Sequence, residues 1–148
     1  MSGEQPYLLA LHNRSSPSEA EWTAFWSLIQ DHYAQPGAAD FIGIVVTEGG
    51  GPNARQRKLV SALAKDRLAK GSVISDNPLI RGVVTAFQWL SISQMKSFSP
   101  AHAGAAFDYA TLTGSERERA LRDFTELGEK IEGGNPMQAV NRAIAARV

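Results

Sequence analysis

The chain contains no cysteine among its 148 residues. This absence excludes disulfide bonds, thiolate nucleophiles, and the zinc and iron–sulfur sites that depend on cysteine ligands. The three histidines, His12, His32 and His102, show neither the H-x-x-x-H nor the H-E-x-x-H spacing of a helical zinc site. The sequence therefore offers no local nucleus for a metal centre, and we expect no metal or other cofactor.

Excess charge of one sign is also missing. Lysine and arginine together number 15, aspartate and glutamate together number 15, and the formal net charge is zero. A protein that binds nucleic acid through a large part of its surface is typically basic. The basic segment 54–70 contains no aromatic residue on which a base would stack. We therefore expect no nucleic-acid partner.

Long hydrophobic runs are absent as well. The longest apolar run, residues 41–46, has six residues, whereas a membrane-spanning helix needs about 20. Residues 1–6 show neither the basic region nor the apolar region of a signal peptide. We expect a protein that does not span a membrane and that resides in the cytoplasm.

The chain has enough apolar residues, 43% of the total, to build one hydrophobic core. Its length is close to the usual size of a single domain. We therefore expect one α/β domain over residues 1–148. Within it we expect a flexible N-terminus at 1–6, a core of strands and helices at 7–112, and a helical extension at 113–148.

Proline positions predict where helices begin. Five of the seven prolines directly follow serine, asparagine or glycine, which is typical of a helix with its N-cap before the first helical residue. Ser16–Glu19 and Ser115–Glu118 also have the S-x-x-E pattern of a capping box. Together these signals predict six helix starts, at Ser16, Gly51, Asn77, Ser99, Ser115 and Asn135.

Short apolar runs precede four of these helix starts. They are residues 7–11, 41–46, 72–74 and 95–98. The run 41–46 does not alternate between apolar and polar residues, which is typical of a strand buried on both faces. Alternating strands and helices predict a three-layer α/β domain with a mostly parallel sheet of about four strands. Two further helices follow at the C-terminus.

Polar residues follow the predicted strands. In open α/β sheets, ligands bind at the carboxyl ends of parallel strands, where helix N-termini also point. Candidate binding residues from this edge are His12, Thr47, Glu48, Asp76 and Asn77, with Arg81 in the helix that follows. The alternative is that helix caps are polar by nature, which accounts for Asn77 without any ligand.

A glycine-rich turn is the most specific local feature. Residues 49–54 satisfy the pattern G-x-G-x-x-A between a strand and a helix, which is the outline of a phosphate-binding turn. Pro52 removes one N–H donor, and the turn follows the second predicted strand instead of the first, so a dinucleotide is disfavoured. The candidate ligands of an anion are Gly49, Gly50, Gly51, Asn53 and Arg55. Alternatively, the glycines only permit a positive φ.

Two segments resemble the STAS or SpoIIAA-like superfamily of small α/β domains, which includes anti-sigma-factor antagonists and SEC14-related lipid-binding proteins. They are 41–47, leading through the turn into 53–63, and 73–78, leading into the next helix. The resemblance covers roughly residues 7–112. It implies a STAS-like fold and a regulatory role. The phosphorylatable members carry an Asp-Ser turn before the second helix, and Glu48–Asn53 lacks that serine.

These observations lead to a functional prediction with alternatives. We expect a non-enzymatic regulatory or protein-interaction module that docks a protein partner near the glycine-rich turn and the helix after it. The alternative is a domain, with or without catalytic activity, that binds a nucleotide or another small anionic ligand at the same turn. A further alternative is a homodimer formed through the helices at 115–148.

Overall fold

The structure is a computed structural model that describes residues 7–37, 41–51, 53–56, 58–59, 68–80, 94–131 and 137–145. One four-stranded sheet lies at its centre, and every neighbouring pair of strands is parallel. The strands follow one another in the sheet in chain order: β1 (Tyr7–His12), β2 (Phe41–Thr47), β3 (Leu68–Ile74) and β4 (Met95–Phe98). The predicted α/β class and parallel sheet are confirmed.

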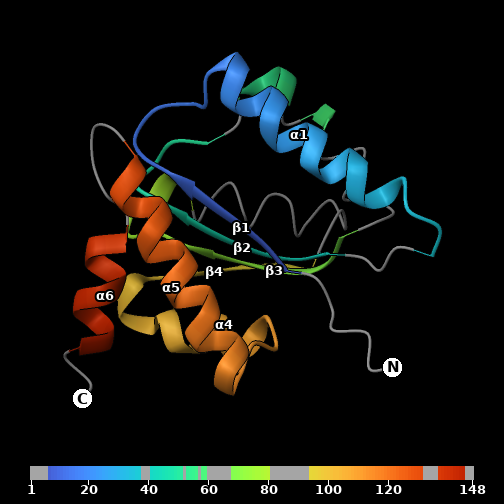
Figure 1. Cartoon of the computed structure of the whole chain (residues 1–148). Helices are drawn as coiled ribbons and strands as arrows, with labels where there is room; N and C mark the ends of the chain where they lie inside the picture. The colour runs from blue at the N-terminus through green and yellow to red at the C-terminus, as the bar shows by residue number, and fades with distance from the viewer. Residues whose placement is uncertain are drawn as a thin grey trace.

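Helices cover both faces of this sheet (Figure 1). One face carries α1 (Glu19–Tyr33), and the opposite face carries α4 (Ala103–Tyr109), α5 (Gly114–Lys130) and α6 (Met137–Ala145). A short 3-10 turn, η1 (Pro100–His102), leads into α4. Residues 54–56, 58–59 and 78–80 also have helical backbone, as predicted after the second and third strands.

Three predicted boundaries were wrong by a few residues. The N-cap of α1 is Ser18, which exchanges two hydrogen bonds with Glu21, so the second of two overlapping S-x-x-E patterns forms the capping box. Because α1 starts two residues later than predicted, the loop that connects the end of β1 to the helix is longer by two residues. The N-cap of α5 is Thr113, two residues before Ser115, and it makes no side-chain capping bond. Strand β3 starts at Leu68, four residues before the predicted run at 72–74. The apolar run was predicted too short because Lys70 and Gly71 interrupt it in the sequence.

The hydrophobic core lies between the sheet and the layer of α4, α5 and α6. Its most buried side chains come from all three helices and the two central strands. They include Ile44, Ile74, Phe107, Phe124, Met137 and Val140, all at most 1% exposed. Helices α5 and α6 therefore supply part of the main core.

Arg117 ties α5 to α4. Its guanidinium group donates a 3.0 Å hydrogen bond to the Gly104 carbonyl, pairs with the Asp108 carboxylate, and lies 5.6 Å from the centre of the Phe107 ring. These contacts fix the two helices against each other at the rim of the core. Ser72, fully buried in β3, donates a 2.7 Å hydrogen bond to the Ala106 carbonyl and so anchors α4 to the sheet.

We predict that Phe124→Ala lowers the free energy of unfolding by about 3–5 kcal/mol, because it removes a fully buried ring from the core. Leu79→Ala is the control, since Leu79 is 78% exposed. Urea unfolding followed by circular dichroism measures both variants. Equal, small losses would contradict the placement of α5 in the core.

Candidate functional site

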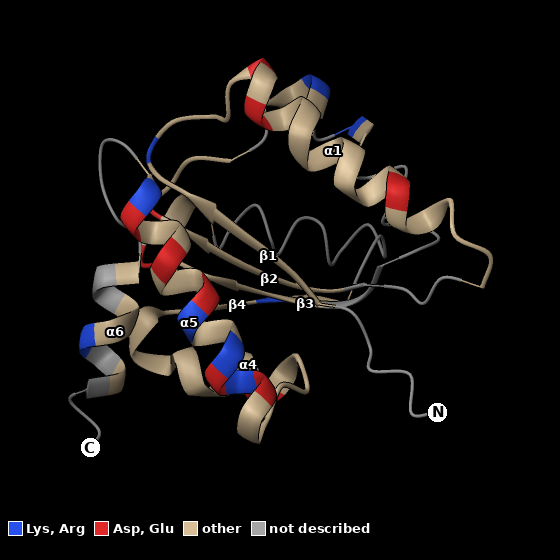
Figure 2. Cartoon of the chain, in the orientation of Figure 1, with Lys and Arg blue, Asp and Glu red and all other residues tan. Residues whose placement is uncertain are grey.

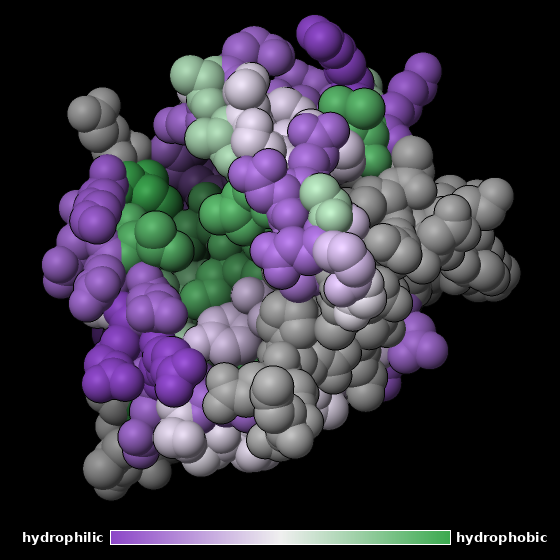
Figure 3. Space-filling view, turned by 45° about the vertical axis from the view of Figure 1, so that its right-hand side comes forward, coloured by the Kyte–Doolittle hydropathy of each residue, from purple (hydrophilic) through white to green (hydrophobic). Residues whose placement is uncertain are grey.

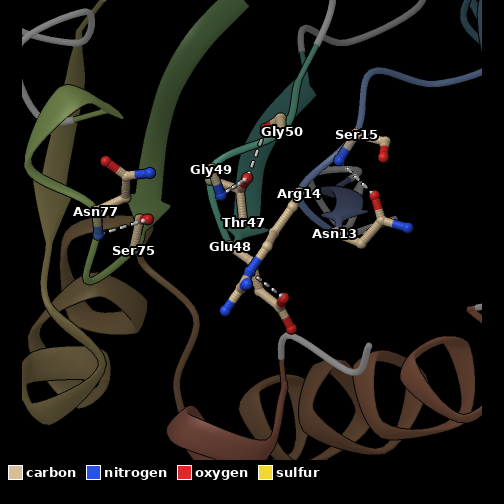
Figure 4. A network of polar contacts seen from close by, with 9 residues as sticks. All are labelled: Asn13, Arg14, Ser15, Thr47, Glu48, Gly49, Gly50, Ser75 and Asn77. Atoms are coloured by element: carbon tan, nitrogen blue, oxygen red, sulfur yellow. Dashed lines mark hydrogen bonds and ion pairs between the residues drawn. The ribbon is translucent and has the colours of Figure 1, made fainter. Parts of the chain in front are cut away.

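The turns after β1 and β2 lie next to each other at the carboxyl edge of the sheet (Figure 4). Backbone hydrogen bonds join them. The Glu48 N–H donates to the His12 carbonyl at 3.0 Å, and the Gly50 N–H donates to the Asn13 carbonyl at 2.8 Å. The sheet edge thus brings His12, Thr47, Glu48 and Gly50 together, as the sequence predicted for strand ends. These bonds fix the β1–α1 loop against the glycine-rich turn.

The glycine-rich turn is also closed from within. The Thr47 hydroxyl accepts a 3.0 Å hydrogen bond from the Gly49 N–H and donates to the Gly50 carbonyl. The N–H groups of Gly49 and Gly50 therefore both have partners inside the protein. An anion at this turn would have to compete with those two bonds.

The helix after the turn has a reciprocal cap. The Asn53 side chain accepts a hydrogen bond from the Gln56 N–H, and the Gln56 side chain accepts one from the Asn53 N–H, both at 2.9 Å. Gln56 is fully buried and was not among the predicted residues, although the N-x-x-Q spacing is the signal of a capping box. Asn53 thus serves the start of this helix.

The remaining predicted residues lie at the same edge with different exposure. Asn77 accepts a hydrogen bond from the Leu79 N–H and lies beside Gly49, so the turns after β2 and β3 are neighbours. Asp76 and Arg55 are exposed. The half-buried Gly51 belongs to the turn itself, and Arg81 lies outside the described residues.

Arg14 reaches the glycine-rich turn through an ion pair with Glu48. Its guanidinium lies 3.7 Å from the Glu48 carboxylate, and its side chain is 87% exposed. This is a surface ion pair, of the kind that typically contributes less than about 1 kcal/mol.

A groove of about 870 Å³ lies beside β1, between α1 and α5. Its apolar lining comes from β1, from α1 and from the C-terminal end of α5 with the residue after it: Leu9, Leu11, Trp22, Phe25, Leu127 and Ile131. The loop between β1 and α1 adds polar lining, with Asn13, Ser15, Ser16 and Ser18. Figure 3 shows a hollow with hydrophobic side chains inside it and hydrophilic side chains around its rim. His12, Glu21 and Lys130 add polar groups to the lining.

The groove runs along the outer edge of β1. It touches the last four residues of β1, 9–12, and Asn13 directly after the strand. Successive side chains of a strand point to opposite faces of the sheet, so a space that reaches all four strand residues lies along the strand's edge. Among the described strands, β1 pairs only with β2. The groove therefore occupies the place that a further strand would take.

His12 connects the glycine-rich turn with the groove. Its carbonyl accepts a hydrogen bond from the Glu48 N–H, and the residue also lines the groove. Burial lowers the pKa of the imidazole from its ordinary value of 6.5, and the nearby Glu21 carboxylate opposes that shift. The neutral form of the ring is favoured in the folded protein. His12 can thus offer one donor and one acceptor to whatever fills the groove.

The sequence did not single out the walls of the groove. Trp22 and Phe25, and likewise Leu127 and Ile131, are spaced by three or four residues, which predicts only that each pair shares an apolar helix face. Helical periodicity does not tell which part of an apolar face extends beyond the sheet edge. That information depends on the strand order, which no local pattern carries.

Comparisons with known proteins give this chain no family. No protein-family model matches it, and neither the curated proteins nor the solved structures contain a match. The STAS-like resemblance therefore stays a prediction. Within the part of the chain that the structure describes, no helix is both long and apolar enough to cross a membrane. Over that same part, no cluster of three or more His, Asp or Glu side chains could hold a metal ion.

We predict that Gly50→Ala lowers the free energy of unfolding by about 1–3 kcal/mol, because overpacking displaces backbone. A Cβ atom at position 50 would lie 2.2 Å from the Ser15 carbonyl oxygen and 2.5 Å from that of Asn13. Gly51→Ala is the matched control, since a Cβ there meets nothing within 4 Å. Thermal unfolding of both variants measures the difference, and equal melting temperatures would contradict the close approach.

We predict that His12 makes the protein less stable as the pH falls below 6.5. The unfolded chain binds a proton near its ordinary pKa of 6.5, whereas burial makes the folded His12 resist that proton. The free energy of unfolding should therefore fall between pH 7.5 and pH 5.5 by more in the wild type than in His12→Asn. His102→Asn, at an exposed position, is the control. Identical pH dependence of wild type and His12→Asn in urea unfolding would refute the prediction.

Proposed function

We propose that this domain is a protein-interaction module, and that it binds an extended protein segment as an added strand along β1. The observation that carries this proposal is the groove, which follows four consecutive residues of β1, 9–12, a strand that has a described neighbour on one side. The interaction class is the one expected from the sequence. The docking surface proposed here is the edge of β1, next to the glycine-rich turn.

The backbone of β1 supports strand addition. The His12 carbonyl accepts from Glu48 in the β2 turn, and successive strand residues direct their N–H and C=O groups to opposite edges. Leu9 and Leu11 therefore direct their backbone groups away from β2, into the groove. Main-chain bonds to such an edge give affinity without requiring one particular sequence.

The walls define the side chains that an added segment needs. Leu127 and Ile131 of α5 lie on one side of the edge, and Trp22 and Phe25 of α1 lie on the other. A strand in this place would be covered on both faces, so its successive side chains should all be apolar. A segment that alternates between apolar and charged residues would bury its charges against one of the two helices.

Site-specific photo-crosslinking tests this proposal. We expect p-benzoylphenylalanine in place of Leu127, which is 41% exposed in the groove wall, to crosslink to a run of apolar residues in a protein. The same group in place of Leu79 probes the surface beside the glycine-rich turn. Mass spectrometry locates the crosslinked segment, and a synthetic peptide of that segment should compete for position 127.

Three results distinguish the docking surfaces. Crosslinks from position 127 that the peptide displaces support the groove. Crosslinks from position 79 alone support the turn instead and overturn the groove. Crosslinks from position 127 to small molecules alone would favour the ligand-binding alternative, in which His12 contacts an amphipathic ligand.

A further inference from the structure

We propose that the strand docked on β1 is the β1 of a second copy of this chain. The two strands pair antiparallel across a two-fold axis and join the two sheets into one. This inference rests on the proposed function, because it names the occupant of the same groove. An antiparallel pair is the arrangement that lets the same strand edge serve both copies of a two-fold dimer.

Strand β1 itself meets the requirements of the groove. Its sequence, YLLALH, contains no charged residue, no proline and no glycine, and five of its six residues are apolar or aromatic. Soluble proteins usually protect an edge strand with a lysine, a proline, a bulge or a covering segment. β1 carries neither a lysine nor a proline. A second β1 would give the outward backbone groups of Leu9 and Leu11 their partners.

The groove side of α1 is complementary to itself when two copies run antiparallel. Glu21, Phe25, Leu28 and His32 recur at i, i+4, i+7 and i+11, so they share one stripe of the helix. Glu21 and Phe25 line the groove, and Leu28 is 58% exposed. Inverting the stripe places Phe25 against Leu28 of the second copy. It also places the Glu21 carboxylate against the His32 ring of the second copy.

The stripe of α5 that contains Lys130 shows a second complementary pair. Glu116, Asp123 and Lys130 are spaced by seven residues and lie on one stripe, and Lys130 lines the groove. Inversion places Glu116 of one copy opposite Lys130 of the other, twice in each dimer. Asp123 meets Asp123 of the second copy at the centre, which opposes the two favourable pairs. Figure 2 shows both acidic and basic residues along this helix.

These two stripes decide between a second copy and another occupant. A small ligand or an isolated peptide would fill the groove and leave Leu28 and the Glu116 end of α5 uncovered. A second copy covers both stripes at once, because α1 and α5 accompany β1 on opposite faces of the sheet. Apolar contacts and opposite charges then meet along both stripes.

Sedimentation equilibrium of the full chain over a concentration series tests the inference. We expect a reversible dimer for the wild type. Leu28→Glu should weaken it at least tenfold, because the substitution acts twice in a symmetric contact and places a charge against Phe25 of the second copy. Leu79→Glu is the matched control at a 78% exposed site away from the groove, and it should leave the dissociation constant within about twofold.

Charge exchange on α5 gives a test that distinguishes weaker self-association from a loss of folding. Lys130→Glu and Glu116→Lys should each weaken self-association about fivefold to tenfold, because each brings like charges together twice. Mixing the two variants should restore association, since Glu116 of one variant then meets Lys130 of the other. A loss of folding would reduce association in the mixture as well.

The outcomes separate this inference from the proposed function. A monomer at all concentrations, or a dimer insensitive to Leu28→Glu and to charge exchange, overturns the second copy as occupant. If position 127 still crosslinks to an apolar segment of another protein, the proposed function stands without it. A protein that stays monomeric and also gives no crosslink from position 127 contradicts both the second copy as occupant and the proposed function.

Discussion

The order of the strands is the constraint on which the other features depend. Four parallel strands follow one another across the sheet in chain order, so β1 lies at its edge. Helices α1 and α5 lie on opposite faces beside this strand, and the space between them is the groove. The free strand edge, its apolar walls and the polar end at His12 all follow from this arrangement. A sheet with β1 at its centre would have no such groove.

This topology also explains why the site lies at an edge of the sheet. In many open α/β sheets a ligand crevice forms at the carboxyl ends of the strands, where the strand order reverses. Among the four described strands the order does not reverse. The turns after β1, β2 and β3 instead pack against one another, and Gly50 brings two of them close enough for a 2.8 Å backbone bond. The glycine-rich turn thus holds the β1–α1 loop, which forms one end of the groove.

Local sequence patterns predicted the elements and their parallel arrangement, but not the order of the strands in the sheet. The bounds of β4 matched the predicted run at 95–98, and β1 and β2 differed by one residue, because strands buried in a sheet are short apolar runs. The edge position of β1 depends on contacts between distant segments, which periodicity does not encode. For the same reason Trp22 and Leu127 looked like ordinary core residues, whereas His12 was found because it ends a strand.

The depth of α6 in the core has a consequence for how the chain folds during synthesis. Met137 and Val140 are fully buried in one core cluster with residues that are translated much earlier, among them Ile44 and Phe107. The core facing α4 therefore stays open to water until residues near 140 have left the ribosome. A nascent chain stalled before this point would expose an apolar sheet face to chaperones.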